Sequence, residues 1–184
     1  MTIIKKSKII RSFVLVSIIL ISGKLEAASF SLDRLSLSGG AIYPFDSWYP
    51  GYQIGAGLSV FQLSEDISIS TGVCYWESQN SKEIMEGVAL SDVRIGLGFK
   101  YDLPASGYYS GFGLSYNSIY KDYHNSRMPQ PLQQEPENLF GASLFTGYNI
   151  SYDGYDALFA ELEYSHISNY NTIGLKFGLY LYIF

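Results

Sequence analysis

The feature that most constrains the fold is a strict alternation of apolar with polar or small residues, which recurs along the chain in long runs. In the clearest run, from Val88 to Tyr101, one set of alternate positions is apolar: Val93, Ile95, Leu97, Phe99 and Tyr101. The positions between them are polar or glycine: Asp92, Arg94, Gly96, Gly98 and Lys100. A period of two residues predicts a β-strand with one apolar and one polar face.

Eight segments of this kind can be marked, at residues 34–43, 52–62, 66–77, 88–102, 108–120, 138–150, 157–168 and 172–184. Most of them exceed the length of about 5–6 residues that is usual for strands of soluble domains. A tilted strand needs about 9–11 residues to cross a bilayer. The sequence therefore predicts an all-β fold, an eight-stranded antiparallel transmembrane β-barrel with a filled lumen. A secreted β-sandwich is the alternative.

The connections alternate in length. Residues 64–65, 104–107 and 152–155 form short turns, whereas 44–51, 78–87 and 121–137 form longer loops. Short turns at one end and long loops at the other are typical of outer-membrane barrels. The last connection, at 169–171, is short for a loop at the outer end.

Residues 1–28 have the pattern of a secretory signal peptide. Four basic residues between positions 5 and 11 precede an apolar stretch at 13–22, and Ala27 and Ala28 provide a small-residue cleavage site. An uncleaved transmembrane helix is the alternative, but Lys24 interrupts the apolar stretch before the roughly 20 residues that a span requires. The expected domain organisation is therefore a signal peptide at 1–28 and an outer-membrane barrel at 29–184.

The charge balance excludes some function classes. Of 12 Lys and Arg residues, five lie in the first 28 positions, and of 17 Asp and Glu residues one does, so the remainder has a net charge of 7 − 16 = −9. A chain of this charge is not expected to bind nucleic acid, which requires clustered basic residues. With one cysteine and two histidines, no metal site, disulfide or cofactor is predicted.

The alternation directs several charged side chains into the lumen. They are Asp92, Arg94, Lys100, Glu161, Glu163 and Lys176. Because an eight-stranded barrel is only wide enough for side chains, three acids and three bases there predict a network of ion pairs that fills the lumen. A narrow, porin-like channel is an alternative, and the paired Glu161 and Glu163 raise acid–base catalysis as another.

The last two strands carry a family resemblance. Residues 159–165 and 171–179, followed by an aromatic C-terminus at Phe184, resemble the closing hairpin of the small eight-stranded outer-membrane β-barrel proteins, a group of surface-antigen and porin-like barrels. The resemblance implies location in the outer membrane of a Gram-negative bacterium. It also implies contact with outer-membrane lipid and lipopolysaccharide, and insertion by the barrel-assembly machinery.

A second, local resemblance concerns His166-Ile167-Ser168-Asn169. This segment resembles the His-x-Ser-Asn motif of the lipid A 3-O-deacylases, in which a histidine acts as base for a serine nucleophile. His166 and Ser168 would take these roles, on one face of the strand at 157–168. The glutamate that orients the histidine in that family has no counterpart after Asn169.

Two regions are candidates for contacts at the outer end. The loop at 121–137 is long, polar and rich in Pro and Gln, which makes it the expected surface for an extracellular ligand. Aromatic residues near the outer ends of the first three strands predict an interfacial aromatic belt: Tyr43, Trp48, Tyr49, Tyr52, Tyr75 and Trp76.

The favoured function is therefore a non-enzymatic outer-membrane barrel with a structural or surface-interaction role. A lipid A hydrolase and a narrow channel remain as alternatives.

Overall fold

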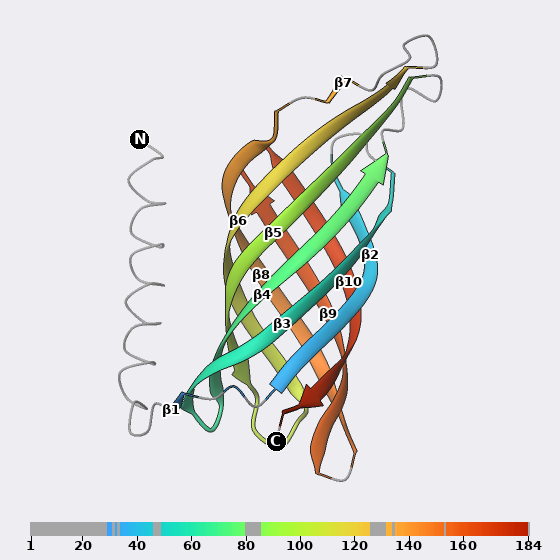
Figure 1. Ribbon diagram of the computed structural model, residues 1–184. Coiled ribbons are helices and arrows are strands. Elements are labelled where there is room, and N and C mark those ends of the chain that lie inside the picture. Colours follow the sequence, from blue (N-terminus) through green and yellow to red (C-terminus); the bar gives the residue numbers. More distant parts are fainter. Residues whose placement is uncertain are drawn as a thin grey trace, which may run out of the picture.

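The computed structural model describes residues 29–30, 32, 34–45, 49–79, 86–125, 132–133, 135–152 and 154–183 (Figure 1). These residues form eight long strands: β2 (Arg34–Pro44), β3 (Gly51–Ser64), β4 (Ile67–Gln79), β5 (Glu86–Asp102), β6 (Tyr108–Asn125), β8 (Glu137–Tyr152), β9 (Tyr155–Ile167) and β10 (Tyr170–Tyr182). Two strands of two residues each, β1 (Ser29–Phe30) and β7 (Leu132–Gln133), complete the sheet. The described residues contain no helix long and apolar enough to cross a membrane.

The long strands close into a barrel. Each pairs antiparallel with its neighbours in the order β3, β2, β10, β9, β8, β6, β5 and β4, and the pairing of β3 with β4 closes the ring. The N-terminal β1 pairs with the end of β3, where Phe30 lies edge-on to Phe61. The predicted eight-stranded antiparallel barrel is confirmed, and closure of the sheet excludes the sandwich.

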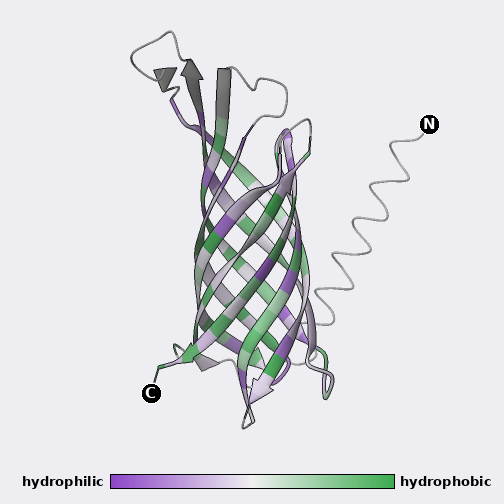
Figure 2. Cartoon of the chain, turned by 90° about the vertical axis from the view of Figure 1, so that its right-hand side faces the viewer, coloured by the Kyte–Doolittle hydropathy of each residue, from purple (hydrophilic) through white to green (hydrophobic). Residues whose placement is uncertain are grey.

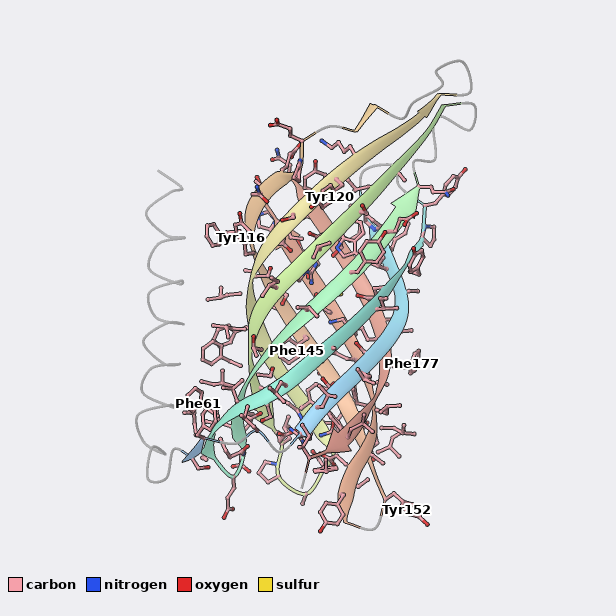
Figure 3. The ribbon with its side chains drawn as sticks, viewed as in Figure 1. Phe61, Tyr116, Tyr120, Phe145, Tyr152 and Phe177 are labelled. Carbon is pink, nitrogen blue, oxygen red and sulfur yellow. The ribbon has the colours of Figure 1, made fainter. Side chains whose placement is uncertain are left out.

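The two faces of the strands differ as the alternation predicts. Hydrophobic and hydrophilic residues alternate along the strands in Figure 2, and Phe61, Tyr152 and Phe177 project from the outside of the barrel in Figure 3. The outward side chains in the middle of the strands form an apolar band that includes Ile54, Val73, Ile95, Leu97, Leu114, Leu144, Leu162, Leu175 and Phe177. Charged and hydrogen-bonding side chains face the lumen, as described below.

Glycines in the lumen make room for large rings. Gly111, Gly147 and Gly178 are the cross-strand partners of Phe145, Tyr109 and Phe159. In each pair a Cβ atom on the glycine would collide with the aromatic ring opposite. The rings lie over the glycines because a narrow barrel has no other space for them.

The two ends of the barrel are unlike. Turns at Glu65–Asp66, at residues 103–107 and at Gly154 join strands at one end, which we call the turn end. At the opposite end, the loop end, β5 and β6 extend beyond the other strands (Figure 1). The strand boundaries agree with the predicted ones to within a few residues, except that β6 runs five residues further.

One boundary corrects the predicted site. Ser168 was expected on the strand at 157–168, on the same face as His166, but β9 ends at Ile167. Ser168 lies in the tight turn to β10 with φ +53°. The prediction is wrong because Ile167 pairs directly with Tyr170, which leaves only Ser168 and Asn169 to reverse the chain. The predicted signal segment 1–28, Trp48 and Phe184 lie outside the described residues.

Candidate functional site

A network of charged side chains crosses the lumen. Arg94 on β5 forms ion pairs with Glu163 on β9, across the barrel, and with Asp92 on its own strand at 3.7 Å. Its Nε atom donates to Asn117 Oδ1 at 3.1 Å, and Nη1 also donates to Ser165 Oγ at 3.2 Å. Because β5 and β9 are not neighbours in the sheet, this contact holds together opposite walls of the barrel.

Lys176 joins the same network from β10. Its Nζ atom forms ion pairs with Glu163 and, at 3.1 Å, with Glu161. Glu161 also accepts a hydrogen bond from the Tyr109 hydroxyl at 3.1 Å. Both glutamates are therefore held by cations and hydroxyls, an arrangement that suits them to structural ion pairing and leaves neither as a free acid or base.

Two further ion pairs lie nearer the turn end. Lys100 Nζ lies 2.8 Å from Asp102 Oδ1 and 4.3 Å from the centre of the Tyr109 ring. Arg34 Nη1 lies 3.4 Å from Asp156 Oδ2. Sequence reasoning missed Arg34, Asp102 and Asp156. Asp156 was missed because a bulge in β9, opposite Ile150 and Ser151, changes the side of the strand to which its side chain points.

An apolar cluster fills the lumen toward the loop end. It consists of the buried side chains of Ile42, Trp76, Leu90, Ile119 and Ile167, and we call it the apolar plug. Trp76 has no exposed surface, and its indole nitrogen donates to Asp92 Oδ2 at 2.9 Å. Its predicted place in an outer aromatic belt is wrong. Tyr43, Tyr49 and Tyr52 are exposed as that prediction requires.

A cavity lies between the charged network and the turn end. Its volume is about 210 Å³, and serine hydroxyls and glycines of β2, β3 and β4 form much of its wall. Arg94, Glu163 and Lys176 bound it on one side and Lys100 and Tyr109 on another. A second cavity of about 390 Å³, lined by residues of the turns, shares Arg34 and Ser59 with the first.

The His166 region faces outward. His166 is exposed, and its Nδ1 atom lies 2.7 Å from Oδ1 of Asn171, its cross-strand partner. The Tyr164 hydroxyl donates to the same oxygen at 3.0 Å. Glu161 and Glu163 point to the lumen, so the strand itself separates both carboxylates from the histidine. An amide thus occupies the position at which a hydrolase would place the acid that orients its base.

The loop end of the lumen carries a polar rim. Lys121 Nζ donates to Glu137 Oε1 at 2.8 Å, and the Tyr170 hydroxyl donates to Glu137 Oε2 at 3.3 Å. Lys121 and Glu137 bound the predicted recognition loop at 121–137, most of whose side chains lie outside the described residues. No group of three or more His, Cys, Asp or Glu residues that could hold a metal ion occurs among the described residues.

A closed barrel of eight tilted antiparallel strands, with an apolar outer band and a charged lumen, is the fold of the small outer-membrane β-barrels. Among solved structures, Neisserial surface protein A (NspA) matches with a TM-score of 0.59 and 13% identity, covering 86% of this chain and 100% of that one. Ail, the attachment invasion locus protein of Yersinia pestis, matches in complex with the heparin analogue sucrose octasulfate. For Ail the TM-score is 0.55 and the identity 8%, covering 83% of this chain and 99% of that one.

No protein-family model matches the sequence, and no curated protein sequence does. At identities of 13% and 8% the similarity to NspA and Ail is one of fold.

Proposed function

We propose that this protein is a non-enzymatic barrel of the bacterial outer membrane, with a structural or surface-interaction role. One observation carries the proposal, namely that each long strand places apolar side chains outside and polar ones in the lumen, with the charged residues there in ion pairs. An apolar exterior is stable against lipid and would be poorly soluble in water. In this proposal the turn end faces the periplasm and the loop end faces outward.

The expected partners follow from this placement. Outer-membrane lipid and lipopolysaccharide surround the apolar band, and the barrel-assembly machinery inserts the chain behind the cleaved signal at 1–28. The loop at 121–137, on the β5–β6 side, is the proposed surface for an extracellular ligand. The polyanion in the Ail structure is a poor guide to that ligand, because the net charge of −9 after residue 28 would repel a sulfated sugar.

Fractionation tests the placement. Cells that make the full chain should yield it in the outer-membrane fraction, and an unheated sample should migrate faster in gel electrophoresis than a boiled one, since an intact barrel stays compact in detergent. Recovery as a soluble periplasmic protein, with one mobility before and after boiling, would contradict the proposal.

A lipid A hydrolase is the second candidate, favoured by the contact between His166 Nδ1 and Asn171. If Nδ1 donates to the amide oxygen, Nε2 is left unprotonated and able to act as a base. We nevertheless expect no deacylation, because an amide does not stabilise the imidazolium as a carboxylate does. Mass spectrometry of lipid A should show the same acyl chains with the wild type and with Ser168→Ala. Loss of an acyl chain with the wild type alone would establish the hydrolase.

A narrow channel is the remaining alternative. The apolar plug opposes it, because five buried apolar side chains stand between the cavity and the loop end. In planar bilayers the folded protein should show no steady conductance, and a steady conductance would revive the channel.

A further inference from the structure

The lumen divides into a sealed part and a hydrated part. Toward the loop end the apolar plug is almost free of exposed surface, and none of its five side chains lines the cavity. Toward the turn end the wall combines serines, glycines and charged groups with the aromatic rings of Phe145, Phe159 and Tyr180, and the 210 Å³ and 390 Å³ cavities share Arg34 and Ser59. Cavities of this size with hydroxyl and charged groups in their walls can hold several water molecules.

The closed end of the cavity has an unsatisfied donor. Arg94 is 8% exposed and lines the cavity, and its Nη2 atom makes no hydrogen bond with the described residues. A buried guanidinium nitrogen without an acceptor is costly, so an occupant of the cavity should supply one. Water and small anions are the species that carry such an acceptor and fit the space.

Cys74 marks this closed end. It is the cross-strand partner of Arg94 and lines the same cavity. Along β4 the lumen-facing positions run from Ser68 and Ser70 at the turn end, through Cys74, to Trp76 in the apolar plug. The thiol therefore lies at the last lumen-facing position of β4 before the apolar plug.

We propose that the lumen is a blind aqueous vestibule, open only toward the turn end, which admits small hydrophilic solutes as far as Cys74 and Arg94. The inner cavity is lined by four basic and two acidic side chains: Arg34, Arg94, Lys100 and Lys176 with Glu161 and Glu163. The outer cavity is lined by Arg34 and four acidic side chains: Glu65, Asp66, Asp102 and Asp156. Because charges of both signs line this route, small size and hydrophilic character are the properties that admit a solute. Cys74 is accordingly a site that a small hydrophilic thiol reagent can modify in the folded barrel.

The test uses methanethiosulfonate reagents on the full-length chain. The Cys74 thiolate attacks the sulfenyl sulfur of the reagent, which forms a mixed disulfide and releases methanesulfinate, while the thiol proton passes to buffer. The protein is folded into lipid vesicles, and a protease-cleavable C-terminal tag reports which end faces the bath. Labelling should occur when the turn end faces the bath and not when the loop end does. Equal labelling from both sides, or none in the folded barrel while the unfolded chain is fully labelled, would overturn the proposal.

The size of the reagent gives a second test on the wild-type chain. The small ethylsulfonate reagent should react with Cys74, and a reagent carried on a polyethylene glycol chain should not. Reaction of the bulky reagent with the folded barrel would refute a narrow vestibule.

A matched pair of variants tests the route. Ser70→Trp places a large side chain in the lumen between the turn end and Cys74, whereas Ile69→Trp places it on the outer face of the same strand. Ser70→Trp should abolish labelling and Ile69→Trp should not, with heat-dependent mobility confirming that both are folded. Unchanged labelling of folded Ser70→Trp would overturn the route. If Ser70→Trp does not fold, the sidedness and size tests on the wild type decide.

Discussion

The inner and outer faces of the same strands are built on different principles. Inside, specific partners meet, as where Arg94 and Lys176 share Glu163 and where Trp76 donates to Asp92. Outside, Ile95, Leu97 and their neighbours form an exposed apolar band. In the proposed membrane setting one apolar side chain there can replace another, because each would contact lipid more than protein. The comparison teaches that specificity in this fold resides in the lumen, whereas the exterior needs only to be apolar.

The largest effect should come from breaking the luminal network. Arg94→Ala leaves Glu163 and Asp92 with one cation fewer, and loss of one partner from a buried ion pair usually costs about 3–5 kcal/mol of unfolding free energy. The neighbouring outward variant Ile95→Ala should cost less than about 1 kcal/mol, since lipid replaces the lost contacts. Urea titration in lipid vesicles, followed by tryptophan fluorescence, measures both. A loss below about 1 kcal/mol for Arg94→Ala would mean that the lumen is more hydrated than the ion pairs indicate.

A charge placed outside should cost somewhat less and should depend on depth. Ile95→Lys puts a cation in the middle of the apolar band, where about 2–4 kcal/mol is expected. Ser110→Lys, also outward but near the turn end of β6, should cost about 0–1 kcal/mol because its side chain reaches the interface. The same titration compares them. Equal costs at the two depths would contradict the assignment of the band to the bilayer core.

Tyr75 and Trp76, neighbours on β4 that face opposite sides of the barrel, allow a finer comparison of an outer and a luminal hydrogen bond. Trp76→Phe removes the donor to buried Asp92 Oδ2 and should cost about 1–3 kcal/mol, the usual penalty for an unsatisfied buried acceptor. Tyr75→Phe removes a 2.7 Å bond to Glu77 on the outer face near the loop end, where water can replace it, so a change below about 0.5 kcal/mol is expected. Similar costs for both variants would show that Trp76 is less isolated from water than its burial indicates.

This neighbouring pair also shows what sequence can and cannot predict. Alternation is a local property, so strand positions, barrel class and the facing of the luminal charges could be read from the sequence. The same alternation forbids Tyr75 and Trp76 from facing outward together, and sequence reasoning erred by grouping them on aromatic character alone. Val73 is an apolar residue of the outer face, and Trp76 follows it by three positions on the same strand. Because side chains alternate between faces, this odd spacing was the signal that could have placed Trp76 in the lumen.

Contacts between strands that are not neighbours were beyond sequence reasoning. The pairing of Arg94 with Glu163 depends on the tilt and stagger with which the barrel closes, and no residue on β5 encodes its partner on β9. Asp156 was missed because one bulge in β9 reverses the side to which it points, and Ser168 was misplaced because a two-residue turn stands where a strand end was predicted. For both Asp156 and Ser168, the position of the residue is set by a break in the alternation and not by the alternation itself.

The smallest effect concerns the turn between β9 and β10, where one substitution should raise the unfolding free energy instead of lowering it. Ser168 has φ +53°, a left-handed conformation that costs a residue with a Cβ atom about 1–2 kcal/mol. Ser168→Gly removes this cost but adds about 0.5–1 kcal/mol of chain entropy to the unfolded state, so a net stabilisation of about 0–1 kcal/mol is expected. Asn169→Gly, at the next position, adds the same entropy without relieving a positive φ and should destabilise the barrel. Urea titration of the two variants side by side gives the sign directly. If Ser168→Gly proved as destabilising as Asn169→Gly, Ser168 would contribute through its side chain, which would renew interest in its hydroxyl beside His166.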